Sequence, residues 1–207
     1  MRKGKLVLTP DDWADAALRA MAEGGVGAVA INKLAKELGA TRGSFYWHFA
    51  DRAALIKAAL LRWERLGITD VVAEMEHIAD PRLQLQHGYR AAFSNLEEGD
   101  IEAALSAHAS DPLIAPFLER VAVARLRTLR QVYDAMGFDP IAAEDRARMT
   151  FAIYLGHFQL RRSLPGGREE ISADYIDRLF GLLTEPPPGR NRRVPASERD
   201  RGRARGG

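Results

Sequence analysis

Apolar residues recur at helical spacing along most of the chain, and this pattern predicts an all-α protein. The first predicted helix covers residues 10–23, because Thr9 supplies an N-cap hydroxyl and a proline follows at the first helical position. Trp13 lies on the apolar stripe of this helix and is expected in the core. Gly24 and its neighbouring glycine are expected to end the helix.

Two short helices are predicted next, over residues 31–38 and 42–49, with Gly39 in the turn between them. Thr41 stands at the N-cap of the second helix. This second helix is too short to be stable alone, so neighbouring elements must hold it. Two helices joined by a short glycine-containing turn are typical of a helix-turn-helix.

The second of these helices has an unusual set of side chains. Phe45 and Phe49 are four residues apart and can face the core together. The other positions carry hydroxyls, a guanidinium, an imidazole and aromatic rings, which suit phosphates and base edges. These positions are Thr41, Arg42, Gly43, Ser44, Tyr46, Trp47 and His48.

The segment from Gly39 to residue 60 resembles the recognition-helix region of the TetR family of bacterial transcriptional repressors. The family pattern is a glycine, then aromatic–Tyr–x–His–Phe at residues 45–49, then a basic residue at Arg52. The strong match covers about residues 9–60, and beyond it only length and helix order agree. Ala30 departs from the family, which usually has a capping Thr or Ser there that touches phosphate.

The resemblance implies an all-α fold of about nine helices, with an N-terminal three-helix helix-turn-helix DNA-binding domain and a C-terminal helical ligand-binding and dimerisation domain. It also implies a ligand-responsive repressor that binds a palindromic operator in double-stranded DNA as a homodimer. We assign base reading to Thr41, Arg42 and Ser44. Contacts to phosphate are assigned to four further residues, namely Tyr46, Trp47, His48 and Arg52.

Charge and composition divide the chain into three parts: residues 1–50 as the DNA-binding domain, 51–184 as the effector-binding and dimerisation domain, and 185–207 as a disordered basic tail. Residues 1–50 carry seven Lys or Arg against five Asp or Glu, and the tail carries seven Arg against three acids. A basic arm precedes residue 8. Positive charge at these ends is the expected footprint of phosphate binding.

The second domain is predicted to begin with a long helix that Gly67 kinks and that acts as a lever. A break is expected at residues 98–100, where the sequence reads Glu-Gly-Asp. The two last helices are apolar enough to predict a four-helix interface with a second subunit, in which Gly156 allows close approach. The predicted helices cover residues 51–77, 81–96, 101–108, 113–136, 140–164 and 172–183.

An apolar cavity for a small-molecule effector is expected inside this domain. Its candidate lining consists of aromatic and histidine side chains, each of which is individually more typical of plain core packing. The candidates are Trp63, His87, Tyr89, Phe93, His108, Tyr133, Phe151, Tyr154 and Phe158.

Catalytic, metal and cofactor chemistry finds little support in the sequence. The chain has no cysteine, no nucleotide-binding fingerprint and no HExxH. Glu74 and His77 form half of a di-iron helix motif without a second half. We expect no catalytic residue, no metal, no cofactor and no membrane span, and a cytoplasmic location. A helical enzyme, a small-molecule binder without DNA activity, and a regulator that senses a protein remain alternatives.

Overall fold

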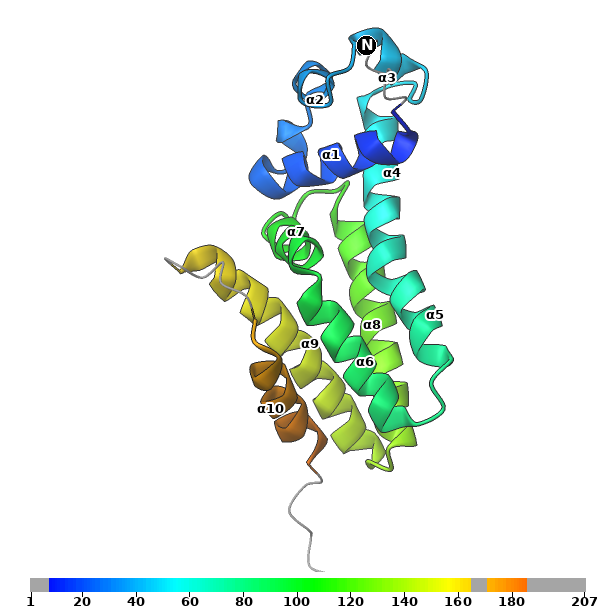
Figure 1. The fold of residues 1–207 in the computed structure, drawn as a ribbon, viewed down its shortest axis with the longest axis vertical. Coiled ribbons are helices and arrows are strands. Elements are labelled where there is room, and N and C mark those ends of the chain that lie inside the picture. Colours follow the sequence, from blue (N-terminus) through cyan, green and yellow to red (C-terminus); the bar gives the residue numbers. More distant parts are fainter. Residues whose placement is uncertain (1–7, 165–170, 186–207) are drawn as a thin grey trace, which may run out of the picture.

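The computed structural model describes residues 8–164 and 171–185, and within them every regular element is helical. Figure 1 shows a small group of helices at the N-terminal end, from which α4 runs down along a larger helical body. The predicted all-α class is therefore confirmed. The elements are α1 (Pro10–Gly24), η1 (Val26–Ala28), α2 (Ile31–Glu37), α3 (Arg42–Tyr46), α4 (Arg52–Glu64), η2 (Arg65–Asp70), α5 (Val71–Glu76), α6 (Pro81–Ser94), α7 (Leu96–Ser106), α8 (Ala115–Ala135), α9 (Pro140–Ser163) and α10 (Ala173–Thr184).

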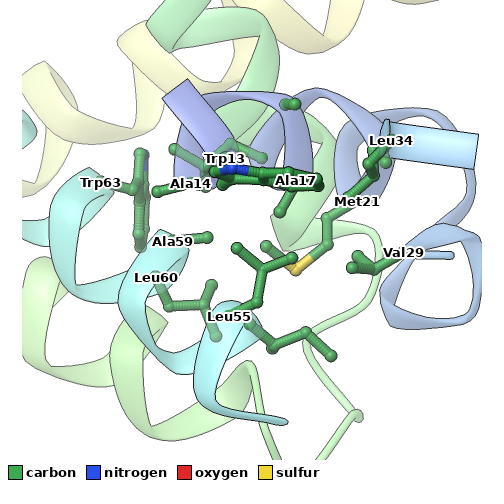
Figure 2. Close-up of a cluster of buried hydrophobic side chains, with 14 of the residues drawn as sticks. Trp13, Ala14, Ala17, Met21, Val29, Leu34, Leu55, Ala59, Leu60 and Trp63 are labelled. Atoms are coloured by element: carbon green, nitrogen blue, oxygen red, sulfur yellow. The ribbon is translucent and has the colours of Figure 1, made fainter. Parts of the chain in front are cut away.

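The N-terminal helices share one hydrophobic core, built mainly by α1 and α4. Thr9 and Asp12 cap α1 reciprocally: the Thr9 hydroxyl accepts from the Asp12 N–H, and the Asp12 carboxylate accepts from the Thr9 N–H at 2.7 Å. Trp13 is fully buried in this core, as predicted. Figure 2 shows it among the apolar side chains that α1 and α4 contribute to this core, which include Leu60 and Trp63 of α4. The core thus continues past residue 50, where we place the domain boundary.

The predicted long helix over residues 51–77 is one rod with a change of helix type in it. Asp51 caps α4 by accepting from the Ala54 N–H at 2.8 Å. Residues Arg65–Asp70 form the π-helix η2, and α5 continues directly from it. Gly67, the expected kink, lies inside this wider turn.

The break predicted at residues 98–100 is wrong. Those residues lie inside α7, and the interruption comes earlier, at Asn95, whose side chain accepts from the Glu98 N–H. Gly99 is buried there because the ring of Phe158 packs against its Cα, so a Cβ would overlap the ring. Gly99 allows α7 and α9 to approach each other closely. The sequence analysis interpreted the same glycine as a helix breaker.

The remaining helices form the larger body around a second core. In it α8 packs along α9, α7 packs against both α1 and α9, and α10 contacts α6 and α9. The second core joins residues of α5 to α10, including Met75, Phe93 and Phe158.

The basic arm, residues 165–170 and the tail after Glu185 lie outside the described residues. None of the helices in the described parts of the chain is long and apolar enough to cross a membrane.

Candidate nucleic-acid interface and ligand cavity

Helix α3 is short, and its position depends on a capped N-terminus and on a buried aromatic side chain. The Thr41 hydroxyl accepts from the Ser44 N–H at 3.2 Å and so caps the helix. Phe45 is fully buried, with its ring 5.4 Å from that of Trp13 in an edge-to-face arrangement and 5.7 Å from that of Phe49. The helix therefore depends on the N-terminal core for its position.

The opposite side of α3 is open to solvent. Thr41, Arg42 and Gly43 are exposed, and Tyr46 and Trp47 are 49 % and 88 % exposed. Arg42 Nη2 donates to the Tyr46 hydroxyl at 3.3 Å, so these two side chains form one polar unit on the surface. Such groups can donate to phosphates and to base edges.

Ser44 and His48 are half-buried at the edge of this surface. The His48 ring lies 6.5 Å from the ring of Phe49, at the border between the core and the solvent. Both residues stay close enough to solvent for the predicted DNA contacts, which remain a prediction.

Arg52 has a different position from the one expected of a phosphate contact. Its Nε donates to the Val29 carbonyl at 2.6 Å, and its Nη2 donates to the Val26 carbonyl. The guanidinium thus fastens the start of α4 to the segment between α1 and α2. These two bonds use two of the five N–H donors of the guanidinium, so a phosphate contact by Arg52 through the other donors stays a prediction.

The absence of a hydroxyl at Ala30 has the expected structural result. Ala30 occupies the N-cap of α2 with extended backbone and makes no side-chain hydrogen bond there. The first N–H groups of α2 are therefore left without the side-chain partner that Ser or Thr would provide.

A cavity of about 410 Å³ lies in the larger body, between η2 and α5 on one side and α6, α8 and α9 on the others. Its wall is mainly apolar, with a few charged and hydroxyl groups. The lining comprises Leu66, Gly67, Ile68, Asp70, Val71, Val72, Glu74, Met75, Leu85, Gly88, Tyr89, Ala91, Ala92, Asn95, Glu98, Arg125, Thr128, Leu129, Thr150, Phe151 and Tyr154.

Three of the predicted lining residues, Tyr89, Phe151 and Tyr154, line this cavity. Phe93 and Phe158 instead pack within the second core, with stacked rings 6.2 Å apart. Tyr133 is also fully buried there and bonds through its hydroxyl to Thr150 at 2.9 Å.

The other three predicted lining residues are not among the residues that line this cavity. Trp63 belongs to the N-terminal core. His87 is on the surface, where its Nε2 lies 3.1 Å from the Glu74 carboxylate. His108 packs against Gly25, which has a φ of +67° and leaves only 3.0 Å between a built Cβ and the His108 ring. This histidine touches the turn after α1, so it joins the larger body to the N-terminal helices.

Sequence reasoning missed the charged residues beside the cavity. Glu102 is 1 % exposed and faces Arg125, whose Nη1 donates to the two carboxylate oxygens at 2.6 and 2.8 Å. The Tyr154 hydroxyl donates to the same carboxylate at 3.2 Å, and Arg125 Nη2 donates to the Gly67 carbonyl at 3.2 Å. The available signal was Glu102 itself, an acid placed between Ile101 and two alanines.

The electrostatics of this cluster follow from burial. Burial opposes the charged form of Arg125, but Glu102, Tyr154 and Glu98 together outweigh this effect, and the pKa of Arg125 is raised. Burial raises the pKa of Glu98, opposed by Arg125 and reinforced by Glu102. Burial also raises the pKa of Tyr89, whose hydroxyl donates to Thr150 at 3.0 Å. No group of acids and histidines in the described ranges is arranged to hold a metal ion.

Comparison with known proteins gives matches at two scales. Residues 14–59 match the family model described as "Bacterial regulatory proteins, tetR family". A curated relative, the HTH-type transcriptional regulator AcrR of Shigella flexneri, is 44 % identical over 41 residues, which are 20 % of this chain and 19 % of that protein. The chain thus matches only about a fifth of the length of this relative.

Solved structures resemble the chain over most of its length. AibR, in complex with isovaleryl coenzyme A and operator DNA, has a TM-score of 0.63 at 16 % identity, over 86 % of this chain and 98 % of AibR. A protein from Saccharomonospora viridis, described as a transcriptional regulator and solved with choline, has a TM-score of 0.64 at 21 % identity, over 84 % and 94 % of the two chains. At these identities the likeness shows a shared fold.

Proposed function

We propose, from the match of residues 14–59 to the tetR family of bacterial regulatory proteins, that the chain is a ligand-responsive transcriptional repressor that binds operator DNA as a homodimer. One observation carries the proposal. The solvent-exposed side of α3 and the cavity flank the two ends of a single helical rod, made of α4, η2 and α5.

In this proposal α3 enters the major groove of DNA. Arg42 and Ser44, near the start of the helix, read base edges, and Tyr46, Trp47 and His48 contact phosphates. In a two-fold dimer the two copies of α3 meet half-sites about 34–36 Å apart, or a multiple of that distance.

The rod is fastened to its surroundings, so a shift at the cavity can reach α3. Arg62 Nε bonds to Asp15 of α1 at 2.6 Å, and Arg120 of α8 bonds to Glu64 of α4 at 2.7 Å. Ligand binding beside η2 would move α4 relative to α8 and carry the N-terminal helices with it. We propose that the ligand favours one of two dimer geometries, and that only the other fits DNA.

The dimer interface is proposed on α9 and α10, whose outward faces are apolar. An exposed stripe follows α9 at helical spacing from Met149 through Gly156 to Leu160, and Leu182 of α10 is 67 % exposed. A Cβ built on Gly156 meets nothing within 4 Å, so the surface is open there for a partner helix. A surface of this kind is typical of a subunit contact.

A gel-shift assay with DNA from upstream of the gene tests the proposal. The change of both Tyr46 and His48 to Ala should weaken binding to all sequences alike, because phosphate contacts are lost. Arg42→Ala should instead relax sequence preference. Arg127→Ala, an exposed change on α8, is the control. Unchanged DNA affinity in the double variant, with the fold intact, would refute the assignment of α3.

A further inference from the structure

The cavity wall carries more negative than positive charge. Three carboxylates, those of Asp70, Glu74 and Glu98, line it together with one guanidinium, that of Arg125. The Arg125 charge is already balanced by the buried carboxylate of Glu102, at 2.6 and 2.8 Å. The wall therefore offers little positive charge to an anionic ligand.

Two of the three lining carboxylates have partners of their own near the surface. Glu74 lies 3.1 Å from the imidazole of His87, and Asp70 lies 4.0 Å from the guanidinium of Arg65. All four of these side chains are more than 40 % exposed, so water also solvates their charges.

Glu98 differs from both of them. It is half-buried, its Oε2 accepts from Asn95 Nδ2 at 2.8 Å, and its Oε1 lies so close to Gly67 that a Cβ built there would be 2.5 Å away. Among the described residues it forms no ion pair within 4.0 Å. Burial raises its pKa, which is the behaviour of a carboxylate without adequate solvation.

The aromatic part of the wall is also suited to positive charge. The Arg125 guanidinium lies 5.3 Å from the centre of the Phe151 ring and 5.0 Å from that of Tyr154. Both rings line the cavity beside Glu98. Aromatic rings attract cations through their electron-rich faces, and a desolvated site strengthens this attraction. The rest of the wall is aliphatic, with Val71, Met75 and Leu129 among its residues.

We propose that the ligand of this cavity is an amphipathic organic cation, with its ammonium group paired to Glu98 and its apolar part held between α5, α6 and α8. The inference rests on the proposed function, since it names the chemical class of the effector. A ligand with a carboxylate or phosphate in the cavity would bring a second negative charge next to Glu98, so anions of similar shape are excluded.

Calorimetric titration with three probes of equal chain length tests the charge preference: decyltrimethylammonium and decanoate below their micelle concentrations, and 1-decanol below its solubility limit. The protein should bind the cation at least about tenfold more tightly than the anion, because Glu98 attracts the cation and repels the anion. Tighter binding of decanoate, equal binding of all three probes, or no binding of the cation would overturn the proposal.

Glu98→Gln keeps the shape of the side chain and removes its charge, so it should weaken binding of decyltrimethylammonium about tenfold and leave 1-decanol unaffected. Glu119→Gln removes the same charge from an exposed position on α8 that does not line the cavity, and it should change neither affinity. Equal loss in both variants would mean a general charge effect and overturn the role of Glu98. If Glu98→Gln does not fold, the cation–anion comparison in the wild-type protein still decides.

The gel-shift assay separates this inference from the proposed function. Glu119→Gln without ligand should bind operator DNA like the wild-type protein, because Glu119 is exposed on α8 and does not line the cavity. Failure of the wild-type protein to bind operator DNA would refute the repressor assignment, and the calorimetric result would still stand. If the wild-type protein binds operator DNA but prefers decanoate, the inference of a cationic ligand is refuted and the proposed function stands.

Discussion

Replacing Arg125 with Met should destabilise the protein strongly, because it leaves a buried carboxylate without its counter-charge. The Glu102 side chain is 2 % exposed and that of Arg125 18 % exposed, so water can replace little of what is lost. Tyr154 would remain as a donor to Glu102, at 3.2 Å. The Gly67 carbonyl would lose its bond from Arg125 as well.

The magnitude follows from the burial of the pair. Breaking a buried ion pair by removing one partner costs about 3–5 kcal/mol. For a chain of this size about 2–4 °C of melting temperature correspond to each kcal/mol, which gives a fall of roughly 6–20 °C. Replacing both Glu102 and Arg125 with Met should cost much less than Arg125→Met alone, since no unpaired charge then stays buried.

Urea denaturation followed by circular dichroism measures these differences, at one fixed protomer concentration because dimerisation would shift the midpoint. Arg127→Met is the matched control: it removes the same side chain from an exposed position on α8, two residues further along. A loss below about 1 kcal/mol for Arg125→Met, or strictly additive losses in the double variant, would refute the reasoning from burial.

Three further changes have defined outcomes. Ala30→Thr should stabilise the protein by about 0.5–1 kcal/mol in thermal denaturation by giving α2 its missing cap, and no gain would mean that the first turn is capped by water. Gly99→Ala should destabilise it by about 1–3 kcal/mol because its Cβ overlaps the Phe158 ring, whereas an exposed helix would gain from alanine. Burial and, secondarily, Arg161 lower the pKa of His157, so the unfolded chain binds more protons and stability should fall as pH decreases below about 6.5. In His157→Gln that part of the pH dependence should disappear from the unfolding free energy measured between pH 7 and pH 5.

The N-terminal part of the fold was predictable because its signals are local. Thr9 and Thr41 cap helices at the positions expected from sequence, and Trp13 and Phe45 are fully buried as their spacing indicates. Each of these inferences needs only a few neighbouring residues. The outward side of α3 follows in turn, because burial of Phe45 decides which side chains remain exposed.

The cavity was predicted less well because its wall depends on how helices distant in sequence face each other. Residue type selected Phe93 and Phe158 as pocket residues, but their rings pack inside the second core. Arg125 and Glu98 were missed for the same reason, because their role in the cavity wall depends on contacts between α7, α8 and η2. Gly99 was misread for a related reason, since its neighbour Phe158 lies 59 positions away in the chain.

The wide turn of η2 gives the rod a torsional property. An α-helix advances about 100° per residue, so a register fixed at one end sets the facing of every later side chain. Trp63 faces the first core before η2, and Met75 faces the second core after it. Tightening η2 into ordinary α-helix would rotate these two side chains relative to each other, and both cores could not keep their packing. In the proposed mechanism, twist of this segment rather than bending would therefore be the movement that disturbs the packing of both cores.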